Sequence, residues 1–208
     1  MDSELNIEKK RLYLSIAKSM IVVGIIWVVY LLNSTFNLQW NRFGMQPGTL
    51  SGLIGIITMP FLHFDIQHIT SNTLPMLFLT SGLFYYFPKK SLPILFSLLL
   101  ISGIFTWGLG RGGVHVGASG LVYGLAFFLV TISLIKMETS LLAYTLVIVF
   151  LYGSLVWGFF PQLFPHQQIS WEGHLSGAVA GVMLAFIYRK EGPVKKQYFE
   201  EEEEESDE

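Results

Sequence analysis

The chain of 208 residues contains no cysteine, which excludes disulfide bonds and metal sites built on thiolates. It is also poor in charge, since Asp, Glu, Lys and Arg make up 13% of the residues, against about 25% in an ordinary soluble domain. Zinc-protease spacing of the HExxH type is missing too, so we expect neither a metal nor a cofactor. What the chain has is hydrophobic residues, at 52%, and a mean hydropathy of +0.53. This balance indicates a protein that lies mostly within a membrane.

Six stretches are apolar enough to be predicted as membrane-spanning helices, because about 20 mostly apolar residues cross the hydrocarbon core. No small-residue cleavage site closely follows the first stretch, so we expect a retained span rather than a signal peptide. The sequence therefore predicts an all-α membrane protein built as a six-helix bundle. The predicted spans are Ser19–Phe36, Ile66–Phe87, Leu92–Leu109, Val116–Ile135, Ser140–Phe160 and Trp171–Tyr188.

The basic residues predict the orientation of these spans, because Lys and Arg concentrate in cytoplasmic segments. With six spans, eleven of the 13 basic residues fall on one side, and Arg42 and Arg111 fall on the other. Both termini are then cytoplasmic. We predict a cytoplasmic segment over residues 1–18, a membrane domain over 19–188 and an acidic, disordered cytoplasmic tail over 189–208. No organelle-targeting segment is visible, so a bacterial plasma membrane is the expected location.

Two connections on the outer side are unusual. The loop over residues 33–65 is long and contains the apolar stretch Leu50–Met59, which is too short to span and predicts short helices in the interface. The stretch Gly108–Gly117 is rich in glycine, which permits unusual backbone angles and close approach of other groups.

Polar residues occupy equivalent positions in three of the predicted spans. The second, fourth and sixth spans all start on the outer side, and their first turns carry His68 and Asn72, Ser119, and His174 respectively. Polar groups within a span are costly and usually face the bundle for a functional reason. We therefore expect these four side chains to meet just below the outer surface.

Glycine pairs predict how two of these helices pack. Gly120 and Gly124 follow Ser119, while Gly177 and Gly181 lie on the same helical face as His174. Small residues at such spacing let transmembrane backbones approach closely. If the two glycine faces meet, His174 is carried toward Ser119.

This combination suits acyl transfer. A histidine near a serine can take the hydroxyl proton during attack and return it to the leaving amine. Helix N-terminal N–H groups, with His68 and Asn72 side chains, can stabilise an oxyanion. No acidic third member has a required spacing, although Glu172 and Asp65 are near in sequence, so we favour a Ser–His dyad. Tyr123 lies one turn after Ser119 and can stack on His174.

These residues resemble the motifs of one known family, the rhomboid intramembrane serine proteases. Gly117-Ala118-Ser119-Gly120 followed by Tyr123 is similar to the family's GxSG motif, and His174 with Gly177 and Gly181 is similar to its HxxGxxxG motif. His68 and Asn72 match a third motif, HxxxN, with His63 at the expected upstream position. The resemblance covers roughly residues 33–188.

The resemblance implies an enzyme with Ser119 as nucleophile and His174 as general base, and with His68, Asn72 and the Ser119 N–H as the oxyanion hole. Its substrates would be transmembrane helices with a locally unstable segment of small residues near the outer face. Its partners would then be membrane-protein substrates and the lipid bilayer, and not nucleic acid.

Other interpretations remain open at this stage. A relative that binds or retains membrane clients without cleaving them would lack the Ser or the His, and a transporter would carry its polar groups near the bilayer midplane. His63, His115 and His166 fall in outside loops, where we expect structural or solvated roles. Trp157, Phe159 and Phe160 are predicted as an interfacial aromatic anchor, with a lateral gate for substrate as the alternative.

Overall fold

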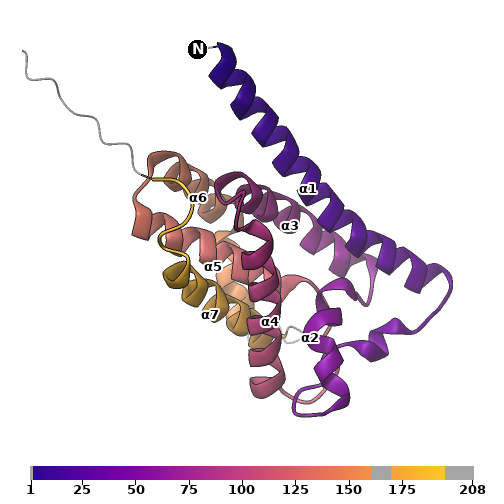
Figure 1. Cartoon of the computed structure of the whole chain (residues 1–208). Helices are drawn as coiled ribbons and strands as arrows, with labels where there is room; N and C mark the ends of the chain where they lie inside the picture. The colour runs from indigo at the N-terminus through magenta and orange to yellow at the C-terminus, as the bar shows by residue number, and fades with distance from the viewer. Residues whose placement is uncertain (1, 161–169, 195–208) are drawn as a thin grey trace, which may run out of the picture.

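The computed structural model describes residues 2–160 and 170–194, and helices account for its regular structure there apart from one isolated antiparallel bridge between Met45 and His115 (Figure 1). The longer helices form a bundle, and the shorter ones lie in the loop between the first two of them. The longer helices are α1 (Asp2–Thr35), α3 (Ile66–Tyr86), α4 (Ser91–Leu109), α5 (Ser119–Lys136), α6 (Thr139–Tyr152) and α7 (Trp171–Ile187).

Each of the six predicted spans corresponds to one of these helices, with two differences in extent. α1 begins already at Asp2, so the predicted cytoplasmic segment over residues 1–18 is mostly a continuation of this helix. α6 ends at Tyr152 and continues as the 3₁₀ helix η4 (Gly153–Phe159), so the fifth predicted span is one α-helix with a tighter last part.

Four helical segments are long and apolar enough by themselves to cross a membrane: Leu5–Thr35, Ser91–Leu109, Ser119–Lys136 and Thr139–Phe159. The other two long helices differ for separate reasons. α3 is long enough but polar in its first turns, and α7 is apolar but has 17 residues. By length and hydropathy, four helices could therefore cross a membrane by themselves, and α3 and α7 pack between them.

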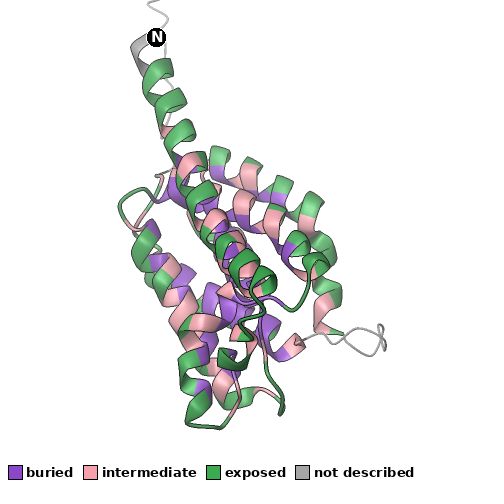
Figure 2. Cartoon of the chain, turned by 90° about the vertical axis from the view of Figure 1, so that its right-hand side faces the viewer, coloured by how far each residue is buried: buried purple, intermediate pink, exposed green. Residues whose placement is uncertain are grey.

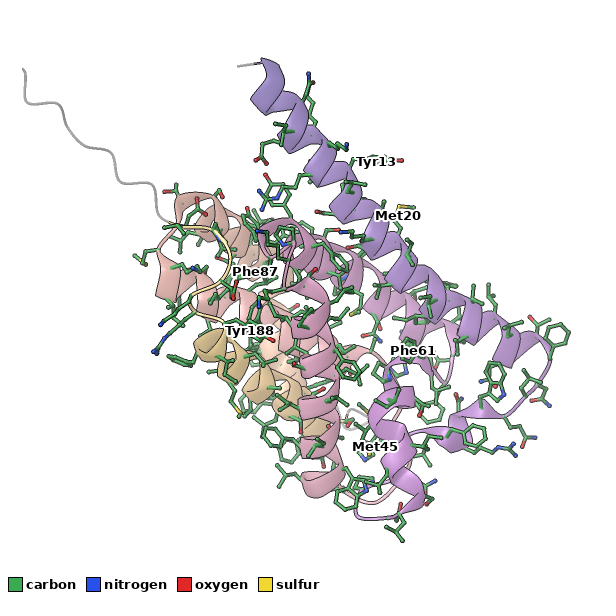
Figure 3. All side chains as sticks on the ribbon, in the orientation of Figure 1. Tyr13, Met20, Met45, Phe61, Phe87 and Tyr188 are labelled. Carbon is green, nitrogen blue, oxygen red and sulfur yellow. The ribbon has the colours of Figure 1, made fainter. Side chains whose placement is uncertain are left out.

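Contacts near the ends of the helices show which ends lie together. At one end, the Tyr85 hydroxyl donates to Glu8 and Lys90 pairs with Glu191 at 3.4 Å. At the other end, the Trp107 indole donates to the carbonyl of Thr49. Figure 3 places Tyr13 and Phe87 toward the first end and Met45 toward the second. Because α3, α5 and α7 all begin at the second end, the polar first turns of these helices lie at one level.

Buried residues gather inside the bundle (Figure 2), and most residues of α5 are among them. α5 and α7 approach so closely that their backbones touch through glycines, which confirms the predicted packing. A Cβ at Gly177 would lie 2.0 Å from the carbonyl oxygen of Gly120, and one at Gly181 would lie 2.3 Å from that of Gly124. Residues 177 and 181 therefore have no room for a side chain.

The long loop between α1 and α3 carries short helices, as predicted, although their depth in the membrane stays a prediction. The short helices are η1 (Trp40–Phe43), η2 (Ser51–Ile54), α2 (Gly55–Thr58) and η3 (Met59–Phe61). Backbone bonds join this loop to the segment before α5. Met45 and His115 exchange two N–H···O bonds of 2.9 and 2.8 Å, and the Gly117 N–H donates to Met59. The loop thus helps to hold the backbone that leads into Ser119.

The glycine contact makes a direct prediction about stability. Gly177→Ala should lower the thermal unfolding midpoint in detergent, because overpacking typically costs about 1–3 kcal/mol. Gly24→Ala in α1 is the matched control, since a Cβ there meets nothing within 4 Å and alanine is the better helix former. Equal midpoints for the two variants would contradict the backbone contact between α5 and α7.

Candidate active site

Ser119 and His174 lie side by side at the starts of two helices. Ser119 is the first residue of α5, and His174 lies in the first turn of α7. The His174 Nε2 atom is 3.1 Å from the Ser119 hydroxyl oxygen, within hydrogen-bond distance. His174 is buried, whereas Ser119 is half-buried. Residues that are far apart in the sequence are thus joined by the glycine contact between their helices.

The second nitrogen of His174 fixes the protonation of the ring. Nδ1 lies 2.9 Å from the carbonyl oxygen of Gly158 in η4, and a carbonyl can only accept. Nδ1 therefore carries the proton of the neutral imidazole, and Nε2 is left as the acceptor for the Ser119 hydroxyl. This is the tautomer that a general base needs. A backbone carbonyl occupies the place that a carboxylate takes in a Ser–His–Asp triad.

Tyr123 holds the imidazole from its face. The two rings are stacked with centroids 4.1 Å apart and an angle of 7° between their planes. The Tyr123 hydroxyl donates to the carbonyl of Leu155 at 2.5 Å, and Phe159 packs edge-on against the same ring. The 3₁₀ segment η4 therefore holds His174 directly through Gly158 and indirectly through Tyr123.

His68 lies against the backbone that precedes the serine. Gly117 has φ +116°, a conformation that favours glycine, and a Cβ there would lie 2.5 Å from the His68 Nε2 atom. Glycine is thus needed both for the backbone angle and for the approach of the ring. The N–H of His68 itself donates to Asp65, which caps the start of α3 at 2.7 Å. Asp65 therefore has a capping role at the start of α3.

His63 connects Asn72 to the start of α5. Its Nε2 atom lies 3.3 Å from the Asn72 amide nitrogen and accepts from the Ala118 N–H at 3.4 Å. The Asn72 amide also donates to the carbonyl of His68 at 3.0 Å. Burial, together with the nearby His68 imidazole, lowers the pKa of His63 to about 4, so the ring is neutral at pH 7. Of the two roles expected for His63, structural or solvated, the structure assigns the structural one.

The acidic residue nearest to His174 in sequence is engaged elsewhere. The buried Glu172 carboxylate pairs with the Arg111 guanidinium from the loop between α4 and α5. The same loop contributes His115, whose Nδ1 lies 2.6 Å from the hydroxyl of Ser170 and whose Nε2 donates to the carbonyl of Arg111. These contacts fasten the loop to the first turn of α7. They give Glu172 and His115 structural roles at the edge of the site.

The remaining predicted residues are accounted for as follows. Gly120, Gly124, Gly177 and Gly181 form the contact between α5 and α7. Phe159 packs on Tyr123, whereas Trp157 is 52% exposed. His166 lies outside the described residues. Among the residues that the structure describes, no group of three or more His, Asp or Glu side chains could hold a metal ion.

The contribution of η4 escapes sequence reasoning. Gly158 and Leu155 act through backbone carbonyls, and every residue has one, so no side-chain pattern could identify them. The position of His63 was easier to predict than these carbonyls, because it carries a polar side chain nine residues before Asn72, in the loop that leads into α3.

Comparison with known proteins places these features in a family. A family model described as a Rhomboid domain matches residues 50–191, which is most of the chain and includes every residue of the site. Uncharacterized proteins of Mycobacterium bovis and Mycobacterium tuberculosis are each 32% identical over 176 residues, covering 79% of this chain and 71% of theirs. An uncharacterized protein of Mycobacterium leprae is 28% identical over 172 residues, covering 79% of this chain and 68% of its own. The family match, together with the apolar helices, indicates an integral membrane protein with bacterial relatives. The chain belongs to the rhomboid family.

Proposed function

We propose that this chain is an intramembrane serine endopeptidase that cleaves transmembrane segments of other membrane proteins near the outer face, through a dyad of Ser119 and His174. The observation that carries the proposal is the hydrogen bond of 3.1 Å between Ser119 Oγ and His174 Nε2, together with the Gly158 carbonyl on Nδ1. Nucleophile, base and an orienting group are then in line, which is the arrangement required for nucleophilic catalysis.

In the proposed reaction, the Ser119 oxygen attacks the substrate carbonyl carbon while its proton passes to His174 Nε2. In the imidazolium that forms, Nδ1–H keeps donating to the Gly158 carbonyl oxygen, and Nε2 later gives its proton to the leaving amine. Water then attacks the acyl-enzyme, with His174 again as base, and releases the second product. The stacked ring of Tyr123 keeps the imidazole in the plane in which both transfers occur.

The oxyanion would be bound by the Ser119 N–H and by the side chains of His68 and Asn72. Ser119 starts α5, so its N–H has no partner within the helix, and the helix dipole favours negative charge there. The Asn72 amide is buried beside the backbone that leads to Ser119.

The proposal includes six membrane crossings with both termini in the cytoplasm. It is supported by the position of the basic side chains of the described residues, which gather at the end of the bundle where Tyr85 meets Glu8 and Lys90 meets Glu191. Ser119 and His174 lie in the first turns of their helices at the opposite end. The cleavage site would thus lie near the outer face, at the depth of one helical turn.

Ser119→Ala should abolish covalent labelling by a fluorophosphonate probe and cleavage of a reporter transmembrane substrate in liposomes. His174→Ala should reduce both by about 10²–10⁴-fold, the usual contribution of a general base. In-gel fluorescence and product quantification measure the two effects.

The same experiment separates the protease from a family member that binds clients without cutting them. A client-binding protein would retain the reporter and leave it intact in the wild type as well as in the Ser119→Ala variant. Undiminished cleavage by Ser119→Ala would disprove the dyad itself.

Asn72→Ala should lower kcat with the reporter substrate, because loss of an oxyanion donor costs up to about 3–4 kcal/mol. Ser71→Ala is the matched control, since its neighbouring hydroxyl donates to the His68 carbonyl and its side chain is exposed. An unchanged kcat in Asn72→Ala, at equal thermal stability, would remove Asn72 from the mechanism.

Reporter fusions after Lys90 and after Arg189 should both read cytoplasmic, and a fusion after Gly112 should read external. Dual alkaline phosphatase and fluorescent protein reporters measure this directly. An external result at either of the first two positions would contradict the six-span arrangement and the outward position of the site.

A further inference from the structure

A concave feature lies at the end of the bundle opposite to Ser119. It is a crevice of about 220 Å³ between the beginning of α1 and the end of α3. In Figure 1 the first turns of α1 extend beyond the end of α3, and Figure 2 shows them as largely exposed. The crevice is lined on the α1 side by Ile7, Lys10, Arg11, Leu14, Ser15 and Lys18, and closed by Phe84 and Pro88.

The crevice has an excess of positive charge. Arg11 is balanced, since its guanidinium lies 3.7 Å from the Glu8 carboxylate and stacks over the Tyr85 ring at 4.7 Å. Lys10 and Lys18 pair with no carboxylate among the residues that the structure describes. The two lysines leave the wall of the crevice with an unbalanced positive charge, which an anionic group would neutralise.

The floor of the crevice is apolar. The Lys18 ammonium lies 5.8 Å from the centre of the Phe84 ring, and Leu14 lies between the two lysines along the helix. Lys10 and Lys18 are eight residues apart, so their Cα atoms are about 12 Å apart along the axis. Side chains of this length can converge on one group between them while their stems cover apolar surface. The ligand that fits is an anion joined to a hydrocarbon chain.

The position along α1 agrees with such a ligand. From Ser19 to Thr35 the helix is apolar, and at 1.5 Å per residue this part covers about 26 Å, close to the hydrocarbon thickness of roughly 30 Å. Lys18 thus stands at the edge of the hydrocarbon layer, and Lys10 stands about 12 Å farther out, so the layer of lipid headgroups lies between them. Anionic lipids are enriched in the cytoplasmic leaflet, toward which the proposed orientation turns this end.

We propose that this crevice binds one anionic phospholipid, with the headgroup phosphate between Lys10 and Lys18 beside Leu14, and with the acyl chains entering the hydrocarbon layer past Lys18 and Phe84. The proposal shares the orientation of the chain with the proposed function and is independent of proteolysis. By clamping the beginning of α1 to the end of α3, the lipid would stabilise the fold at the end away from Ser119.

The test uses the full-length protein in detergent, delipidated and then titrated with phosphatidylglycerol or with phosphatidylcholine, with thermal stability and native mass spectrometry as readouts. Phosphatidylglycerol should raise the unfolding midpoint and remain bound, and phosphatidylcholine should do neither. In Lys10→Gln/Lys18→Gln the affinity for phosphatidylglycerol should fall about 25-fold, since each lysine near an anionic lipid contributes roughly a factor of five. Lys9→Gln/Lys136→Gln removes the same charge from the same end outside the crevice and should change the affinity little.

Three results would overturn the proposal. The first is an equal loss of affinity in the two double variants, which would indicate a diffuse charge effect. The second is an equal stabilisation by inorganic phosphate, which would indicate a soluble anion. The third is binding that appears only after residues 200–208 are deleted, which would make the acidic tail the occupant. Fluorophosphonate labelling of Ser119 in each sample tests the proposed function separately, because lipid binding and labelling can fail independently.

Discussion

The close approach of α5 and α7 is the constraint on which the rest of the site depends. In a membrane, lipid tails are as apolar as leucine, so helices gain little from burying apolar side chains and instead associate where their backbones can come close. At Gly177 the carbonyl oxygen of Gly120 occupies the space that a Cβ would need. Both helices begin at the same end of the bundle, so this contact sets their first turns beside each other. Ser119 and His174 then meet at 3.1 Å without any further element between them.

The choice of a carbonyl as the partner of His174 follows from the same surroundings. A carboxylate at this depth would have to be desolvated, at a cost of several kcal/mol, unless a cation paired with it. Glu172, the acid close to His174 in sequence, is paired with Arg111. This ion pair holds the loop between α4 and α5 against α7. The Gly158 carbonyl is neutral, and its desolvation costs far less. It nevertheless selects the tautomer that leaves Nε2 free to accept the serine proton. This arrangement requires that η4 be held in place, and the hydrogen bond from Tyr123 to the Leu155 carbonyl does so.

How far the sequence predicted this arrangement depends on whether side chains or the backbone make the contact. The helices, the packing of the glycine faces and the meeting of Ser119 with His174 follow from apolar runs and residue spacing, and the structure confirms them. The stacking of Tyr123 follows from its position one turn after the serine. The carbonyls of Gly158 and Leu155 have no sequence signature, because they depend on α6 tightening into a 3₁₀ turn. The start of α1 at Asp2 could not be predicted from hydropathy. The charged residues before Ser19 mark the end of the apolar stretch, but they do not show where the helix begins.

The hydrogen bonds of Asn72 add a condition to the proposed mechanism. Both N–H bonds of its amide are already used, one on His63 and one on the His68 carbonyl, so the amide has no spare donor before a substrate arrives. A buried amide without partners would cost about 1–3 kcal/mol, so these bonds stabilise the unoccupied site. An oxyanion is a better acceptor than either neutral partner, because charge-assisted hydrogen bonds are roughly twice as strong as neutral ones. The ground-state carbonyl of a substrate has no such advantage. The Asn72 amide would therefore leave His63 or His68 when the negative charge develops and not before, so this donor favours the transition state over the bound substrate.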